Sequence, residues 1–341
     1  MNKNKIIILV VIGLVAFVAW KVFGPTVSAP EGKYFYIRTG STFNDVKEGL
    51  LKEHIIGGSF FFEKTAGMLH YTSAVKAGRY EIRNGMSIFN LVRMLRSGNQ
   101  SPVNLVIIKL RTPEGLASLI AKNFECDSVS VMKFLSNPDS IARMGLDSNT
   151  VMTAIIPNTY GILWNSSFPK LFKKIQAEQE KFWTTERKQK ATSLNLTPIQ
   201  AYILASIVED ETTKQEDKGK IASVYLNRLE TGMFLGADPT VIFALKDYSI
   251  RRVLNGHKEV QSPYNTYLHK GLPPGPVCTP SIKTIDATLN APTTGYLYFV
   301  AQPNLTGFSN FSTDYQQHMI YAKAYQAWLT EFLKTKQAAA K

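Results

Sequence analysis

The stretch AYILASIVEDETTK, residues 201–214, combines the apolar spacing of a helix with three acidic residues near its end. Thr197 and Pro198 come just before it, and a hydroxyl residue followed by proline is a typical helix start. At about 100° per residue the apolar side chains form one broad stripe, which consists of Ile199, Ile203, Leu204, Ile207 and Val208. The stretch therefore predicts an amphipathic helix that packs this stripe into a core.

The three acids of this stretch are not equivalent. Glu211 continues the apolar stripe, whereas Glu209 points to the opposite side and Asp210 lies at the margin. A carboxyl group on an apolar face loses hydration, which raises its pKa and suits a general acid. The structural alternative is a Glu211 side chain that turns to water at a fraying helix end, or one that pairs with Lys218 or Arg228.

The first residues predict a membrane anchor. An uncharged stretch runs from Ile6 to Trp20, and with its flanks about 18 to 19 residues are available to cross a bilayer. A secretory signal peptide is the competing interpretation, although Pro30 directly after the small residues VSA disfavours cleavage. Lysines before the stretch place the N-terminus in the cytoplasm. Residues 1–24 would then be the cytoplasmic N-terminus and a single-pass anchor in the cytoplasmic (inner) membrane, and 25–33 a linker into the periplasm.

Composition restricts the partners of the extracytoplasmic part. The net charge of +13 fits either an ordinary solvated surface or an anionic polymer. No arginine-rich run or helix-turn-helix signature is present, so nucleic acid is not expected as a partner. The five histidines lack metal-ligand spacing, so we expect neither a metal site nor a cofactor. Cys126 and Cys278 are the only cysteines, and two buried free thiols are expected rather than a disulfide.

The remaining chain predicts an α+β protein with two parts. Residues 34–101 alternate strand-like and capped helical pieces, which is typical of a small α+β module without catalytic residues. Residues 102–341 form a larger α+β domain that includes a largely helical segment, 115–195. A loop broken by proline and glycine interrupts this segment, and its Tyr160 and Trp164 either line a cleft or fill a core.

Residue types that suit carbohydrate follow the acidic helix. KIASVYLNRLETG predicts another amphipathic helix, and Asp238 followed by Pro239 starts the next one. The loop SPYNTYLHKGLPPGPVCTPS is polar yet stiff, because each proline fixes its φ angle. Its amide, hydroxyl and aromatic groups can hydrogen-bond and stack on sugars.

Four stretches, LASIVEDET, KIASVYLNRLETGMFLGADPTVIFAL, YNTYLHKGLPPGPVCTPS and YLYFVA, stand in the order and spacing of a known set of motifs. Together they resemble the signature blocks of the YceG-like (MltG-type) endolytic murein transglycosylases. Upstream, AGRYEIRNGMSIFNLVRMLRSG resembles the LysM-like module of that family. The resemblance covers most of the chain beyond residue 35, and it implies a LysM-like module at 34–101 and a catalytic domain at 102–341. One departure is Asn158, where the family has an aspartate.

The resemblance implies a lytic transglycosylase that acts on the glycan strands of peptidoglycan. Its motif places the catalytic acid at Glu211, the residue that helical periodicity also selects, with Glu209 as the alternative acid. The protonated acid would donate to the oxygen between N-acetylmuramic acid and N-acetylglucosamine, and the sugar's own 6-hydroxyl would close a 1,6-anhydro end. The residues expected to orient the sugar are Tyr264, Asn265 and Thr266, with Asn227, Asp238, Thr240 and His318 in support.

Other functions remain open from the sequence. A lysozyme-type hydrolase would need a second carboxylate, for which Asp238 is the candidate, and it would leave a reducing end. A non-catalytic wall-binding or division scaffold built on the LysM-like module would not need Glu211. The resemblance further suggests partnership with cell-wall synthases (penicillin-binding proteins), with the enzyme terminating nascent glycan strands.

Overall fold

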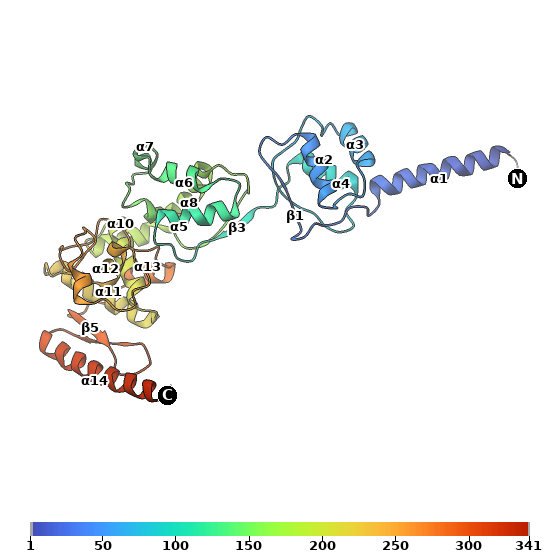
Figure 1. The fold of residues 1–341 in the computed structure, drawn as a ribbon. Coiled ribbons are helices and arrows are strands. Elements are labelled where there is room, and N and C mark those ends of the chain that lie inside the picture. The colour runs from blue at the N-terminus through green and yellow to red at the C-terminus, as the bar shows by residue number, and fades with distance from the viewer. Residues whose placement is uncertain (1–2, 340–341) are drawn as a thin grey trace. The chain divides into compact units, whose positions relative to one another are not determined.

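The computed structural model describes residues 3–339, and the chain forms two compact units that are described one at a time (Figure 1). The first unit consists of Met1–Leu105, Ile120–Asp127 and Tyr160–Ser167. The second consists of Val106–Leu119, Ser128–Thr159 and Phe168–Lys341. The α+β fold with an N-terminal apolar helix is confirmed, whereas the domain boundaries and the LysM-like character of the module stay predictions.

The first unit begins with the apolar helix. Helix α1 (Lys3–Phe23) is long and apolar enough to cross a bilayer, and most of its side chains are exposed. An antiparallel pair of strands and three helices follow: β1 (Tyr34–Ile37), α2 (Phe43–Lys52), α3 (Ser59–Met68), β2 (Gly78–Glu81) and α4 (Ile88–Ser97). Phe35 lies opposite Tyr80 in this pair, and both side chains are buried. Their burial places one face of the small sheet in the core of the unit.

Aromatic side chains in this unit fill a core. A further two-stranded sheet joins β3 (Val103–Val106) to β4 (Thr159–Ile162). Tyr160 on β4 is buried, and Trp164 just after it packs against Tyr36 with ring centroids 5.0 Å apart. Of the two possibilities that the sequence left open for these rings, the structure shows the packing role.

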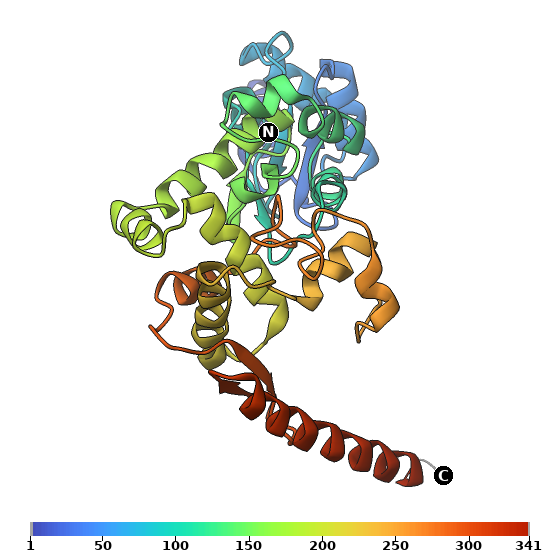
Figure 2. The same cartoon turned by 90° about the vertical axis from the view of Figure 1, so that its left-hand side faces the viewer.

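The second unit is mainly helical. Its elements before the acidic helix are α5 (Pro113–Asn123), which belongs to the first unit from Ile120 on, α6 (Ser128–Leu135), α7 (Pro138–Ala142), the 3-10 helix η1 (Val151–Ala154), α8 (Phe168–Phe182) and α9 (Thr185–Ser193). Those from it onward are α10 (Pro198–Glu211), α11 (Gln215–Glu230), α12 (Asp238–Leu245), η2 (Asn255–Glu259), α13 (Ile282–Leu289), β5 (Tyr298–Ala301), β6 (Ser309–Ser312) and α14 (Tyr315–Ala339). The first turns of α14 pack along the antiparallel β5–β6 hairpin, and its later turns extend past the hairpin (Figure 2).

Helix α10 forms where the sequence places it, but it is not amphipathic. Thr197 caps it by accepting a hydrogen bond from the Gln200 amide, and the Gln200 side chain accepts one from the Thr197 amide in return. Every side chain from Ala201 to Val208 is buried. The expectation of one apolar stripe was wrong because α9, α11, α12, α13 and η1 all pack around this helix. Only its last turn leaves the core, and that turn carries the acids.

The two cysteines are free thiols, as expected. Cys278 is buried, whereas Cys126 is only half-buried and departs from the prediction of two buried thiols. Burial raises the pKa of both thiols, so both stay protonated at neutral pH.

Candidate active site

Glu211 is the last residue of α10, where the helix leaves the core. Thr212 after it has an extended backbone, so the chain turns away and the Glu211 side chain points back toward α11. Tyr225 on α11 donates a hydrogen bond from Oη to Oε1 of Glu211 at 2.6 Å. Glu211 is half-buried and held by this bond, so its side chain is neither frayed nor turned freely to water.

The surroundings of Glu211 favour its protonated form. Burial is the main cause, and it raises the pKa of Glu211 from 4.5 to about 7. The Tyr225 hydrogen bond acts against this rise, while the negative charges of Asp238 and Asp210 add to it and Arg228 opposes it. A carboxyl group that titrates near neutral pH can both give and take a proton, as a general acid–base catalyst requires.

The raised pKa predicts how the stability of the protein depends on pH. Because the folded state holds the Glu211 proton more tightly than the unfolded chain does, this contribution to stability is complete below about pH 4.5 and is lost as the pH rises through about 7. Glu211→Gln is neutral at every pH, so its free energy of unfolding should gain on the wild type by on the order of 2 kcal/mol between about pH 5 and pH 8. Denaturant unfolding of both proteins at the two pH values measures this, and equal pH dependence would contradict the assignment.

Glu209 has a different environment. Its Oε2 accepts hydrogen bonds from Lys218 Nζ at 3.1 Å, from Ser281 Oγ at 3.0 Å and from Thr284 Oγ1. Burial alone would raise the pKa of Glu209, but the bonds from Thr284, Lys218 and Ser281 outweigh burial and lower it. An ionised carboxylate whose Oε2 accepts three side-chain hydrogen bonds suits a structural role, and the geometry favours Glu211 over Glu209 as a proton donor. The sequence-based alternative that pairs Lys218 with Glu211 is wrong, because Lys218 binds Glu209.

Asp210 is bound to two basic side chains that the sequence did not single out. Lys109 and Arg111, from the segment before α5, both form ion pairs with its carboxylate, and the Arg111 guanidinium also lies over the Tyr248 ring. These partners stand about a hundred positions earlier in the chain, so periodicity along α10 carries no signal of them.

Asp238 forms a second pairing of tyrosine with carboxylate. Tyr267 donates from Oη to Oδ1 of Asp238 at 2.7 Å. The guanidinium group of Arg228 is held by backbone groups of other segments, because it donates hydrogen bonds to the carbonyl oxygens of Leu235 at 2.6 Å and Leu297 at 2.7 Å. Tyr225 and Arg228 lie three residues apart on one face of α11, and both were missed as site residues. The polar group of Tyr225 among buried residues of this helix is a sequence signal that could have identified it.

Three of the residues expected to help with the sugar are buried and hydrogen-bonded inside the protein. Asn265 donates from Nδ2 to the carbonyl oxygens of Lys258 and Val260, at 2.8 and 2.9 Å. The hydroxyls of Thr240 and Thr266 are bonded to each other at 2.9 Å, and Thr266 accepts from the Ala237 amide at 3.0 Å. These bonds fix the loop after η2 against the start of α12, so their direct contact with a sugar stays a prediction.

The other predicted residues lie elsewhere around the site. Asn227 donates to the backbone carbonyls of Thr294 and Tyr296, both at 2.8 Å. Tyr264 is half-buried beside Phe243, with ring centroids 4.6 Å apart. His318 stacks on Tyr298 at 5.2 Å. Tyr264 and His318 therefore keep exposed surface, whereas the amide nitrogen of Asn227 is fully used.

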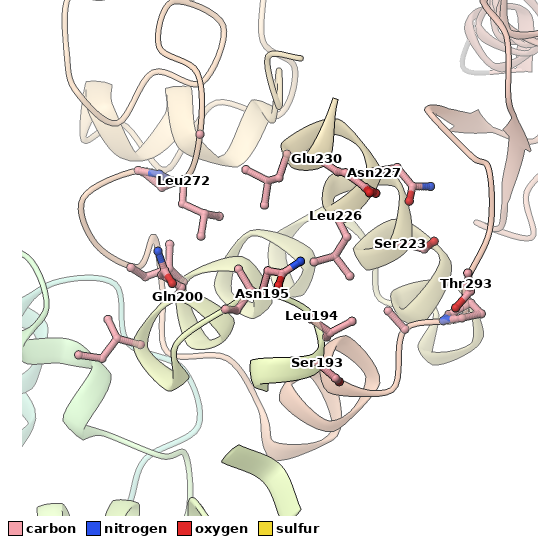
Figure 3. Close-up of a pocket in the computed structure, with 18 of the residues that line it drawn as sticks. Ser193, Leu194, Asn195, Gln200, Ser223, Leu226, Asn227, Glu230, Leu272 and Thr293 are labelled. Carbon is pink, nitrogen blue, oxygen red and sulfur yellow. The ribbon is translucent and has the colours of Figure 1, made fainter. Parts of the chain in front are cut away.

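A cavity of about 810 Å³ lies on another side of α11. Leu226, Asn227 and Glu230 of α11 line one side, and Leu272 and Gln200 lie across from them (Figure 3). Glu211 is not among its lining residues, so the cavity does not mark the acid. Among residues 3–339, no group of three His, Cys, Asp or Glu side chains is placed to hold a metal ion.

A half-buried carboxyl group whose pKa is raised to about 7, with a tyrosine hydroxyl bonded to it, is typical of the class of enzymes that use general acid–base catalysis. The model of the YceG-like family matches residues 35–324, so the chain belongs to that family. The resemblance found in the sequence motifs is confirmed.

Relatives and a solved structure agree with this family. The chain is 28% identical over 295 residues to the endolytic murein transglycosylase of Bacillus subtilis (strain 168), covering 79% of this chain and 78% of the relative. It is 29% identical over 315 residues to the endolytic murein transglycosylase of Streptococcus pneumoniae serotype 2, covering 81% of this chain but only 54% of that longer relative. The crystal structure of the yceG-like protein lmo1499 from Listeria monocytogenes matches with a TM-score of 0.55 and 27% identity, over 84% of this chain and 97% of that one.

Proposed function

We propose that this protein is a membrane-anchored endolytic transglycosylase that cleaves peptidoglycan glycan strands with Glu211 as its acid. The observation that carries the proposal is the half-buried Glu211 carboxyl, whose pKa of about 7 lets it hold a proton at neutral pH. The family membership and the names of the two relatives support the substrate class.

The reaction needs one carboxyl group for both of its steps. Glu211 gives its proton to the bridging oxygen as the bond from that oxygen to C1 of N-acetylmuramic acid breaks, and positive charge develops on the sugar ring. The 6-hydroxyl of the same sugar then bonds to C1 and returns its proton to Glu211. No water is consumed, and the acid is restored for the next cycle. The nearby charge of Asp238 favours the positive ring as well as the protonated acid.

The remaining site residues orient the sugar in this proposal. Tyr264 and His318 keep exposed surface and contact the substrate directly, whereas Asn265, Thr266, Thr240 and Asn227 hold the loops that carry such contacts. Helix α1 anchors the chain in the cytoplasmic membrane with the catalytic unit on the outer side, where nascent strands emerge. Cell-wall synthases that make these strands are the proposed partners.

Product chemistry tests the proposal. The full-length protein in detergent is incubated with purified, uncross-linked glycan strands, and the fragments are identified by mass spectrometry. Fragments that end in 1,6-anhydro-N-acetylmuramic acid, lighter by one water than a reducing end, are the expected result. Reducing ends would instead show a hydrolase in which Asp238 activates water. If a folded protein binds strands but does not cleave them, the non-catalytic wall-binding scaffold would be the remaining function.

A further inference from the structure

Tyr225 is the residue that contacts the acid most closely. It lies in the middle of α11 with a side chain that is 1% exposed, and its ring packs edge-on against Phe299 with centroids 5.9 Å apart. Among residues 3–339, it is the one side chain with a hydrogen bond to the Glu211 carboxyl, at 2.6 Å. The short distance shows a well-formed hydrogen bond, and the packing of the buried ring fixes the direction in which the Tyr225 hydroxyl points.

We propose that Tyr225 is a positioning residue, which keeps the Glu211 proton on Oε2 and stabilises the carboxylate as that proton leaves. This role rests on the proposed function of Glu211 as the acid, and it concerns the part of the site that family membership does not specify.

The direction of the hydrogen bond follows from the chemistry of the two groups. A phenol hydroxyl has one proton to donate, and Tyr225 stays neutral because burial raises its pKa well above 10. When Oε1 of a protonated Glu211 accepts this hydrogen bond, Oε1 is the carbonyl oxygen of the acid. The acidic proton is then on Oε2, which is free of the Tyr225 bond and available to the glycosidic oxygen.

The same bond strengthens during the reaction. A hydrogen bond to an ionised carboxylate is about twice as strong as one between neutral groups. As Glu211 loses its proton, the Tyr225 bond changes from the weaker kind to the stronger kind without any movement of either side chain. An interaction that is stronger in the transition state than in the ground state accelerates the chemical step rather than substrate binding.

Among the described residues, Tyr225 rather than a charged side chain donates a hydrogen bond to the Glu211 carboxyl group. Asp210 on α10 and Asp238 on α12 both favour the protonated acid, so neither helps the proton to leave. Arg228 on α11 favours the carboxylate, but its nitrogen atoms bind the carbonyl oxygens of Leu235 and Leu297. Tyr267, in the loop after η2, donates its hydrogen bond to Asp238.

Tyr225→Phe tests the proposal in the full-length protein in detergent with glycan strands as substrate. We expect kcat to fall about 10-fold to 100-fold with little change in KM, because the variant lacks a hydrogen bond that becomes stronger only as Glu211 becomes charged in the chemical step. The loss of activity on the alkaline side should also move to higher pH, since the bond that lowers the pKa of Glu211 is gone. A residue with a merely structural role would leave the pH profile in place.

The matched control is Tyr202→Phe. Tyr202 lies in α10, nine positions before Glu211, and is also fully buried. Its hydroxyl donates a hydrogen bond to the backbone carbonyl of Ile155 at 2.5 Å. Its loss should lower stability while the pH profile stays that of the wild type. If the loss of activity on the alkaline side of the pH profile moves equally in both variants, the proposal is overturned.

A measurement that does not need activity tests the Tyr225–Glu211 pairing separately from the proposed function of Glu211 as the acid. Infrared or carbon-13 titration of labelled glutamate, with Glu211→Gln to assign the signal, gives the pKa of Glu211 in the wild type and in Tyr225→Phe. A higher pKa in Tyr225→Phe supports the pairing, and an unchanged pKa overturns it even when the enzyme cleaves strands. A higher pKa in Tyr225→Phe, together with a wild-type protein that cleaves no strands, would confirm the hydrogen bond but overturn the catalytic role and with it the proposed function.

Discussion

Glu211→Gln should lower the rate of strand cleavage by about 100-fold to 10,000-fold, which is the usual contribution of general acid–base catalysis. Glutamine has the same shape, and its amide oxygen can still accept the Tyr225 hydrogen bond, so the helix end should keep its structure. It has no acidic proton to give to the glycosidic oxygen. Mass spectrometry of fragments over time measures the rate, and binding of strands to the variant shows that the site is intact.

Two variants make this result specific. Glu216→Gln removes an exposed glutamate at the start of α11 and should cleave at the wild-type rate. Glu209→Gln tests the alternative acid directly, with rates normalised to the folded fraction. Loss of cleavage in Glu209→Gln together with retained cleavage in Glu211→Gln would reverse the assignment.

Glu209→Gln should instead act on stability, with a loss of about 3 to 5 kcal/mol in the free energy of unfolding of the second unit at pH 7. The Lys218 and Glu209 side chains are 8% and 17% exposed, so the change leaves a buried ammonium group without its counter-ion. Because the folded state lowers the pKa of Glu209, the contribution is present above the ordinary pKa of 4.5 and is lost as the pH falls through the folded value. The difference between variant and wild type should therefore shrink in acid, which denaturant unfolding across pH measures.

The double variant Glu209→Gln with Lys218→Met provides the control for this prediction. It removes both charges at once, so it should recover much of the stability that Glu209→Gln alone loses. If the two single changes simply add, the pair is not coupled and the structural role assigned to Glu209 is wrong.

Several features could be predicted from the sequence because they depend on neighbouring residues alone. The start of α10 follows from Thr197, Pro198 and Gln200, which are within one turn of each other. The apolar run of α1 is likewise visible without any tertiary contact. Helical periodicity also distinguished Glu211 from Glu209, since the two side chains leave the helix in different directions whatever surrounds them.

The order of motifs identified the family, but it did not say what each polar residue does. Asn265 and Thr266 seemed suited to a sugar because they combine amide and hydroxyl groups in a stiff loop. The structure places their side chains inside the protein, where backbone groups that must be hydrogen-bonded take up that capacity. A local sequence pattern gives the residue type, whereas burial decides whether the polar atoms face a substrate or the chain itself.

The sequence by itself determined where α10 begins, which part of the chain is apolar enough for a membrane, and that Glu209 and Glu211 leave the helix in different directions. Only the tertiary structure decided the chemical state of the acids. Tyr225 reaches Glu211 from another helix, and Lys109 and Arg111 reach Asp210 from about a hundred residues away. A pKa depends on burial and on charges within a few ångströms, and both are set by segments that meet only when the chain folds.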